Sequence, residues 1–417
     1  MSGSDTKSAT ELIQPRLPTL YVACDEDLRL LQKSLAATDI IAIDAERASG
    51  FRYGQRAYLI QIAVPKDRIF LVDPTPNYEA ELLSSVKALV SSKSWIIHAA
   101  SQDLPCLRDF GLVAINIIDT ELAGRLLGLE KVSLGAMTEL FLQYSLAKEH
   151  SAVDWSTRPL PTEWLNYAAL DVDVLFDLWL AIEKELTKKE KLEIALEEFS
   201  HLLDFQPKPE KAERWRSVTG IHELKDQKQL TILKSLWTAR EKLAKDKDIS
   251  PGRLVPDQSL VAAVKASPKS KSELASLRSF AGRASRTYLD LWWEALEQGS
   301  LQRQLVDLRA EATGIPNHRN WANKFPEANR RLQWMKLYLK EASEKLSIPV
   351  ENLISPETVR SLCFNPPPPN KEEVSASLRT RKARQWQIEI AVPFFIQAFN
   401  QTELPVLETK VSAPAEA

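Results

Sequence analysis

The stretch that most constrains this chain is residues 39–46, which read DIIAIDAE. Four apolar residues in a row predict a short strand that is buried on both faces of a sheet. The strand ends in Asp44 and Glu46, and because these positions alternate, both carboxylates point to the same face. Like charges side by side repel strongly where water is scarce, and a divalent cation between them would relieve this repulsion. The alternative is an ordinary solvated strand end.

Length and charge indicate several domains of opposite charge. At 417 residues the chain is too long for one ordinary core, so we expect two or three domains. Residues 1–200 carry 20 basic and 30 acidic side chains, whereas residues 201–400 carry 33 basic and 23 acidic ones. This asymmetry suggests metal ligands in the first half and a polyanion-binding surface in the second, unless it is chance variation between surfaces.

The remaining composition narrows the class of protein. Three cysteines, far apart in the sequence, form neither a disulfide framework nor a zinc-binding spacing. The N-terminus is polar, so no secretory signal is expected, and no apolar run approaches the ~20 residues that span a bilayer. We therefore expect a cytoplasmic protein with no membrane partner and no disulfide partner.

The acidic half shows the pattern of an α/β domain. The predicted strands lie at residues 40–46, 58–64, 69–72, 95–97 and 115–119, with a further short strand possible at residues 21–23. The first three suggest a meander, because the sequence PKDR at residues 65–68 is typical of a hairpin turn. Helical patterns lie between and after the later strands. Antiparallel strands followed by alternating helices and strands are typical of an α/β fold.

Two further acidic positions fall on predicted elements of this domain. Asp103 follows a strand at the C-terminal edge of the sheet, where open α/β sheets hold ligands. Tyr167 and Asp171 are four residues apart in a helical pattern, so they share one helix face. Each acid also has an ordinary explanation, as a first-turn acid favoured by the helix dipole or as a helix surface acid. Asp173 and Asp177 lie on other faces of the helix and are expected to be solvated.

Together these residues form the pattern D-x-E, D, Y-x-x-x-D. The pattern resembles the exonuclease motifs of the DEDD superfamily, in its tyrosine-bearing branch, and specifically the ribonuclease D family. Agreement extends to YLIQ at residues 58–61, IDT at 118–120 and DWSTRPL at 154–160. The resemblance covers roughly residues 21–186. It implies an RNase H-like fold with a mixed five-stranded sheet and an active site at the sheet's edge.

The resemblance also implies two divalent cations, Mg²⁺ or Mn²⁺, which prefer the oxygen ligands that carboxylates supply. Asp44 would bridge both cations, Glu46 and Asp171 would complete the first site, and Asp103 would hold the second cation. Tyr167 would orient the attacking water. With a pKa near ~10, its phenol is a poor base at neutral pH, so positioning is favoured over proton abstraction.

The loop after Glu46 departs from many members of the family, which continue with an aromatic residue, whereas here it reads RASGFRYG. Phe51, Arg52 and Tyr53, together with Arg47, are candidate contacts for the terminal nucleotides. The alternative is a flexible loop that contains glycine. Further candidate nucleic-acid contacts are Gln61, His98, Arg158, Arg381, Lys382 and Arg384.

The basic half begins with residues 205–211, whose two prolines and lack of periodicity predict a linker. Beyond it, a helical pattern recurs after about 100 residues. The sequences EKL, ISP and LVPD within residues 241–257 have the counterparts EKL, IPV and LISPE within residues 344–357. The repeat resembles two HRDC (helicase and RNase D C-terminal) domains, the second diverged and interrupted by four prolines. Such domains are small helical modules that assist nucleic-acid binding.

These interpretations predict an α/β RNase H-like exonuclease domain followed by two all-α HRDC-type domains. The predicted parts are a flexible leader (1–18), the exonuclease domain (19–204), the linker (205–211), a first HRDC domain (212–300), an HRDC-like domain (301–404) and a disordered acidic tail (405–417). The resemblance implies 3′–5′ exoribonuclease activity that trims structured RNA, such as tRNA precursors, to 5′-monophosphates. Two alternatives stay open: a DNA-directed exonuclease of the same superfamily, and a catalytically idle nucleic-acid-binding scaffold.

Overall fold

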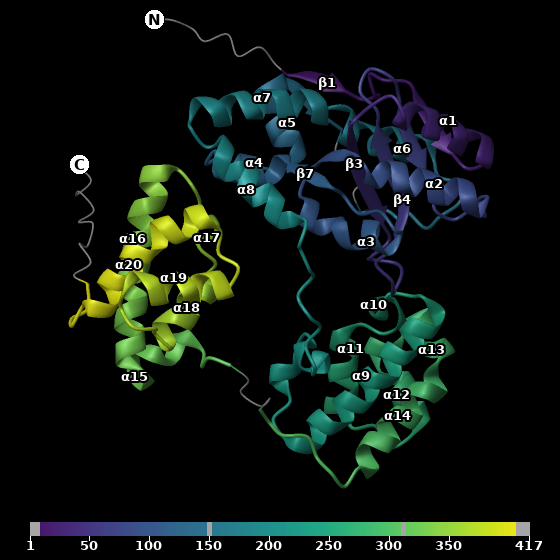
Figure 1. The fold of residues 1–417 in the computed structure, drawn as a ribbon. Helices are drawn as coiled ribbons and strands as arrows, with labels where there is room; N and C mark the ends of the chain where they lie inside the picture. Colours follow the sequence, from purple (N-terminus) through teal and green to yellow (C-terminus); the bar gives the residue numbers. More distant parts are fainter. Residues whose placement is uncertain (1–8, 148–151, 310–313, 406–417) are drawn as a thin grey trace, which may run out of the picture.

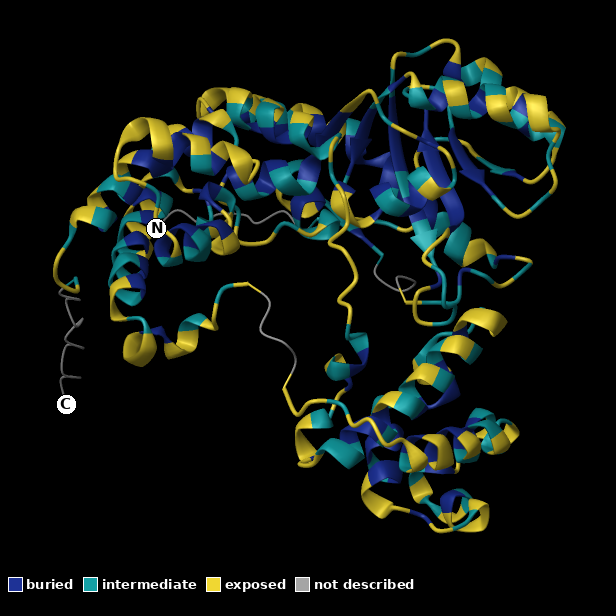
Figure 2. Ribbon diagram, turned by 60° about the horizontal axis from the view of Figure 1, so that its bottom comes forward, coloured by how far each residue is buried: buried dark blue, intermediate teal, exposed yellow. Residues whose placement is uncertain are grey.

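The computed structural model describes residues 9–147, 152–309 and 314–405. An α/β domain is followed by two helical domains, each of which contacts it (Figure 1). Buried residues concentrate in the sheet and on the inward faces of the helices (Figure 2). Residues 1–8 of the predicted leader and residues 406–417 of the predicted tail lie outside the described residues. Within the described parts, no helix is long and apolar enough to cross a membrane.

The α/β domain is built on one mixed sheet with the strand order β2-β5-β4-β3-β6-β7. Its strands are β2 (Thr19–Val22), β3 (Ile40–Arg47), β4 (Ala57–Ala63), β5 (Ile69–Val72), β6 (Ser94–Ile97) and β7 (Asn116–Asp119). The meander of β3, β4 and β5 is antiparallel, whereas β2, β6 and β7 join in parallel. The mixed sheet is confirmed, but it has six strands and not five. The additional strand is β2, a short edge strand beside β5.

Helices cover both faces of this sheet, which is why β4 and β5 are buried along their whole length. The helices of the domain are α1 (Asp25–Leu35), α2 (Ala80–Ser91), α3 (Leu104–Asp109), α4 (Thr120–Leu126), α5 (Leu134–Leu142), α6 (Thr162–Asp173), α7 (Leu175–Lys188) and α8 (Leu192–Leu202). On one face, Ile41 and Ile43 of β3 belong to the apolar cluster formed with α1 and α2. On the other face, Ala42 belongs to the cluster that includes α6 and α7. Because strand residues alternate, Asp44 and Glu46 share the face of Ala42 and point toward α6.

The residues just before the sheet are anchored, in contrast to the flexible leader expected there. Strand β1 (Thr10–Leu12) pairs in parallel with β8 (Tyr144–Leu146). Arg16 donates from its backbone N and its Nε to Asp173 Oδ2, at 3.1 and 2.8 Å, and from Nη1 to Asp177 Oδ2 at 2.7 Å. Asp173 is 2% exposed and not solvated as expected, because Arg16 compensates its charge.

The two helical domains repeat one structural pattern. The first contains α9 (Gln227–Lys247), α10 (Pro251–Leu254), α11 (Asp257–Ala266), α12 (Lys271–Ser276), α13 (Arg283–Thr287) and α14 (Leu289–Leu301). The second contains α15 (Trp321–Lys324), α16 (Pro326–Leu346), α17 (Val350–Leu353), α18 (Pro356–Phe364), α19 (Lys371–Thr380) and α20 (Gln385–Asn400). Helices α9 and α16 both have 21 residues and end in a left-handed residue, Asp248 or Ser347, with φ 49° and ψ 48°. A four-residue helix follows in each copy.

Both left-handed turns contact the α/β domain, at different places. Asp248 Oδ1 accepts hydrogen bonds from the backbone N atoms of Tyr53 (3.2 Å) and Gly54 (3.1 Å). The carbonyl O of Ser347 accepts from Lys191 Nζ at 3.1 Å. It also lies so close to Gly128 that a Cβ there would be 2.4 Å from it, and Gly128 has a φ of +77°. The repeated element therefore docks each helical domain onto the sheet-containing domain.

Candidate active site

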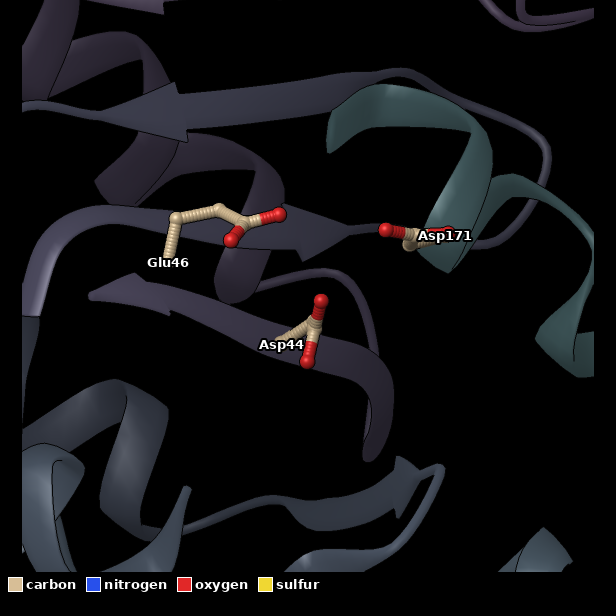
Figure 3. A group of neighbouring side chains, drawn as sticks. All are labelled: Asp44, Glu46 and Asp171. Carbon is tan, nitrogen blue, oxygen red and sulfur yellow. The ribbon is translucent and has the colours of Figure 1, made fainter. Parts of the chain in front are cut away.

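Three carboxylates from two elements meet between the sheet and α6. Asp44, Glu46 and Asp171 lie side by side (Figure 3). Each has a carboxylate oxygen within 4.8 Å of a carboxylate oxygen of the other two. Asp44 and Glu46 come from β3, and Asp171 comes from the helix that lies across β3, β4 and β5. Strand alternation and the packing of α6 thus produce this cluster from residues more than 120 positions apart in the sequence.

Asp103 reaches the same place through Asp44, since their side chains hydrogen-bond to each other. Arg47 Nη2 lies 3.5 Å from Asp103 Oδ1 and partly balances its charge. Asp103 precedes α3 and is 6% exposed. The structure therefore brings together all four carboxylates expected from the sequence.

Asp119 supports the turn that leads to Asp103, a role that the sequence analysis missed. It ends β7, is 3% exposed, and accepts hydrogen bonds from the backbone N atoms of Ala99 (3.1 Å) and Ala100 (2.9 Å). Its carboxylate also caps α4 by accepting from the N atoms of Glu121 and Leu122. Ala99 has a φ of 60°, an uncommon conformation that these hydrogen bonds stabilise. The motif IDT was recognised in the sequence, but the partner of its Asp was not.

When no cation is present, all four carboxylates hold their protons more tightly than ordinary acids do, because their pKa values are raised. Burial raises the pKa of Asp44 to about 6. Burial, and then the charge of Asp44, raise the pKa of Asp103 to about 9. Burial and neighbouring acids, Asp44 first among them, hold the pKa values of Glu46 and Asp171 well above their usual range. Four acids that repel one another, with oxygen ligands alone, are the donor set that hard divalent cations prefer.

Tyr167 stands beside the cluster on α6, one turn before Asp171. Burial, followed by the charge of Asp171, raises the pKa of its phenol. Its ring lies 6.4 Å from the ring of Trp155, measured between centroids, and Trp155 makes an edge-on contact with Trp164 at 5.6 Å. Because the phenol keeps its proton at neutral pH, it is suited to hydrogen bonding and not to taking a proton.

Arg158 has a structural role in place of the nucleic-acid contact expected from the sequence. Its guanidinium donates to both carboxylate oxygens of Asp73, at 2.6 and 2.8 Å. It also donates to the carbonyl O of Tyr58 at 2.7 Å and of Trp155 at 2.8 Å. These contacts hold the segment that carries Trp155 against β4 and β5. The guanidinium is thereby committed to protein partners.

Gln61 and His98 do not fit the expected role of nucleic-acid contacts. Gln61 is 0% exposed, because β4 lies in the middle of the sheet under α6, so its side chain is out of reach of RNA. Burial lowers the pKa of His98 to about 4, and its Nδ1 lies 2.8 Å from Thr120 Oγ1. His98 is therefore neutral at physiological pH and offers no positive charge to a phosphate.

The loop between β3 and β4 is held by the first helical domain. The Arg253 guanidinium lies 3.7 Å from the ring centroid of Phe51, and Tyr53 Oη donates to Glu241 Oε2 at 3.3 Å. On its other side, the loop is fixed by Arg52 Nε, which donates to Ser156 Oγ at 2.7 Å. The loop is therefore a junction between domains, an arrangement that neither sequence interpretation included. Contact of its side chains with nucleotides stays a prediction.

We expect Asp248→Gly to loosen this loop, because glycine keeps the left-handed backbone of residue 248 and removes only the carboxylate. The substitution leaves the backbone N atoms of Tyr53 and Gly54 without their acceptor, at a cost of about 1–2 kcal/mol, or a five- to thirtyfold change in the opening equilibrium. Trypsin cleavage after Arg52 or Arg56 should accelerate by that factor. Asp246→Ala, at an exposed acid of the same helix, is the matched control and should be cleaved at the wild-type rate. Equal cleavage of both variants would contradict the assignment.

The basic cluster near the C-terminus also differs from expectation. Arg384 Nε and Nη2 each lie 2.5 Å from a carboxylate oxygen of Glu198, which is 5% exposed on α8. This ion pair docks the second helical domain and takes Arg384 away from RNA. Arg381 donates to Ser361 Oγ at 3.0 Å but is itself exposed, as is Lys382. For Arg381 and Lys382, RNA contact stays a prediction.

Family models match three parts of the chain: a 3′–5′ exonuclease at residues 20–187, an HRDC domain at 229–296, and a 3′ to 5′ exonuclease C-terminal domain at 314–399. Ribonuclease D from Bartonella henselae is 30% identical over 61% of this chain and 62% of its own length. Ribonuclease D from Zymomonas mobilis is 30% identical over 61% of this chain and 66% of its own length. Residues 20–187 thus carry a 3′–5′ exonuclease domain, and the chain is similar to proteins named ribonuclease D. It nevertheless spans less than two thirds of the length of these two relatives.

Solved structures agree with this family fold. A protein from Bifidobacterium adolescentis has a TM-score of 0.82 and 32% identity, over 94% of this chain and all of its own. RNase D from Escherichia coli has a TM-score of 0.62 and 24% identity, over 88% of this chain and all of its own, and so supports the fold. The first helical domain is the HRDC domain. The second helical domain is helical as expected. The family model that matches it is that of a 3′ to 5′ exonuclease C-terminal domain and not that of an HRDC domain.

Proposed function

We propose that this protein is a 3′–5′ exoribonuclease that hydrolyses RNA ends with the help of two divalent cations. The observation that carries the proposal is the meeting of Asp44, Glu46 and Asp171 oxygens within 4.8 Å, with Asp103 hydrogen-bonded to Asp44. Sequence similarity supports it, since two curated relatives are named ribonuclease D. The Escherichia coli RNase D of similar fold is described as an exoribonuclease involved in structured RNA processing.

Each residue of the cluster has a separate part in this proposal. Asp44, which is adjacent to the other three acids, would be a ligand shared by both cations. Glu46 and Asp171 would complete the set for the first cation, and Asp103 would contribute to the second. When bound, the two cations, Mg²⁺ or Mn²⁺, supply an activated water and neutralise the charge that develops at the phosphate. The protein contributes the fixed orientation of the carboxylates, which the packing of α6 on β3 sets.

Tyr167 acts as a hydrogen-bonding group that positions the attacking water. Its raised pKa keeps the phenol protonated at neutral pH, so it does not take a proton from the water. We expect Tyr167→Phe to lower kcat by about 10²-fold, the cost of a misplaced reactant, because the ring packing on Trp155 is kept and the hydroxyl is lost. Mn²⁺ affinity, measured by calorimetry, should fall less than it does in Asp171→Asn, because Tyr167 is a hydrogen-bond partner of a ligand and not a ligand itself. A Tyr167→Phe enzyme with the wild-type kcat would contradict this role.

The substrate class in this proposal is RNA with a free 3′ end, such as a tRNA precursor, and the product is a 5′-mononucleotide released in the cytoplasm. The excess of basic residues in 201–400 supports a polyanionic substrate that extends over the helical domains. Contacts between basic side chains and the RNA backbone do not depend on the identity of the bases. The expected activity is therefore trimming of RNA ends and not sequence-specific cleavage.

A digest of end-labelled RNA tests the proposal. With 5′-labelled RNA and Mg²⁺ or Mn²⁺, we expect a ladder that shortens from the 3′ end, and with a chelator no cleavage. Equal cleavage of DNA with a recessed 3′ end would favour the DNA-directed exonuclease. RNA binding without cleavage in the presence of either cation would favour the idle scaffold.

A further inference from the structure

The side chain of Gln61 is a buried polar group without a partner, placed next to the carboxylate cluster. Gln61 is 0% exposed, and neither its Oε1 nor its Nε2 has a hydrogen-bond partner among the described residues. It lies on β4 directly opposite Asp44 of β3. Side chains paired in this way across antiparallel strands have Cβ atoms roughly 4.5–5.5 Å apart, within reach of a side chain as long as glutamine.

The neighbours of Gln61 on β4 and β5 are apolar. On the same face of β4 it is flanked by Leu59 and Ala63, both 0% exposed, and on β5 it is paired with Leu71, also 0% exposed. All three belong to the apolar cluster that includes α6. Of the two residues paired directly with Gln61 across the strands, Asp44 and Leu71, Asp44 is therefore the one that can accept a hydrogen bond from its amide.

An amide buried in this way costs free energy for as long as its hydrogen bonds are unmade. A leucine or methionine of similar volume would fill the same space without that cost. Gln61 is thus a buried polar residue between apolar neighbours on β4 and β5, and it lies beside the Asp44 carboxylate. Carboxylates that bind metal ions are usually held by a hydrogen bond from an outer group.

We propose that Gln61 is a positioning residue of the cation site: its Nε2 donates to the Asp44 carboxylate oxygen when a divalent cation is bound. The proposal rests on the proposed function, because it requires that Asp44 binds a cation. Gln61 touches neither substrate nor cation in this account. It orients the ligand that bridges the two cations.

Calorimetric titration of the full-length protein with Mn²⁺ tests this role in Gln61→Met, and in Gln61→Leu should the first variant fold poorly. We expect Mn²⁺ affinity to fall about tenfold or more, the usual effect of removing such an outer group. The ion-free variant should unfold at the same or a higher urea concentration than wild type, because a buried polar group without a partner has been removed. A group with a merely structural role would not produce a weaker cation site in a protein of equal or greater stability.

Thr138→Val is the matched control. The hydroxyl of Thr138 on α5 is likewise 0% exposed and without a partner in the described structure, but it lies outside the carboxylate cluster. We expect this variant to bind Mn²⁺ as wild type does. Wild-type Mn²⁺ affinity in Gln61→Met would overturn the role of Gln61 and leave the proposed function intact. Wild-type protein that binds no Mn²⁺ would overturn the proposed function itself.

Discussion

Asp44→Asn is expected to lower the rate of RNA hydrolysis by about 10³-fold or more. The substitution removes one negative charge from the residue proposed to bridge both cations, and the cations account for several kcal/mol of transition-state stabilisation, with each 1.36 kcal/mol worth a factor of ten. The amide has nearly the same shape as the carboxylate, so the fold should be kept. RNA affinity should change by less than about threefold, because Asp44 lies on the sheet and not among the basic residues proposed to contact phosphates.

Two comparisons make this prediction specific. Asp171→Asn should have an effect of similar size, because Asp171 belongs to the same cluster. Asp39→Asn changes an exposed acid just before the same strand and should cleave RNA at the wild-type rate. Rates are measured in single-turnover digests of 5′-labelled RNA with saturating Mg²⁺. Hydrolysis by Asp44→Asn at a rate near that of wild type would refute the assignment of the site.

The stability of the cation-free protein is expected to fall as pH rises from about 4 to 8. A carboxyl with a raised pKa binds more protons in the folded state than in the unfolded state, so unfolding becomes easier as pH rises from the unfolded pKa through the folded one. For Asp44, a shift from 3.8 to about 6 corresponds to a loss on the order of 3 kcal/mol by pH 7. Asp103, with its pKa near 9, extends the loss to higher pH.

Mn²⁺ should reverse this loss, and more strongly at pH 8 than at pH 5, because the cation binds the ionised carboxylates. Thermal unfolding followed by circular dichroism, with Mn²⁺ or with chelator, measures both effects. A difference of 3 kcal/mol in the free energy of unfolding corresponds to a shift in Tm of about 6–12 °C for a domain of roughly 150–250 residues, the size range of the α/β domain. Asp44→Asn should flatten the pH dependence. Stability that is constant or rising between pH 4 and 8 without cations would contradict the described electrostatics.

The pKa of Asp73 is lowered and not raised, so its contribution to stability increases with pH, but it does so in a lower pH range. Burial alone would raise its pKa, but the hydrogen bond from Arg158 and further hydrogen bonds lower the pKa below 3.8. Its contribution to stability is therefore complete above about pH 4 and is lost as pH falls below that value. It does not mask the change expected between pH 4 and 8.

The parts of the carboxylate cluster that depend only on neighbours in the sequence could be predicted. Asp44 and Glu46 share a face because strand residues alternate, and Tyr167 and Asp171 share a face because they are one helical turn apart. The burial of Gln61 was also predictable, because it is the one amide within the otherwise apolar and aromatic run YLIQIAV. Its burial follows from that run, which argues against the contact with RNA that we expected from the sequence.

The rest depends on partners that are distant in the sequence. Arg158 binds Asp73, Arg16 binds Asp173 and Arg384 binds Glu198, and nothing in the local sequence of either partner specifies the other. The expectations for Arg158, Asp173 and Arg384 therefore failed for the same reason, which is that burial of a charge is decided by the tertiary partner. The repeat of the helical domains was visible in the sequence. The use of Asp248 and Ser347 as docking points was not, because it depends on how each copy packs against the α/β domain.

A crystal soaked in Mn²⁺ and measured at the manganese absorption edge tests the central claim most directly. We expect two anomalous peaks about 3.5–4 Å apart, both in contact with Asp44, one also with Glu46 and Asp171 and the other with Asp103. Manganese bound elsewhere, or the four carboxylates facing apart with no ion between them, would contradict the proposed active site.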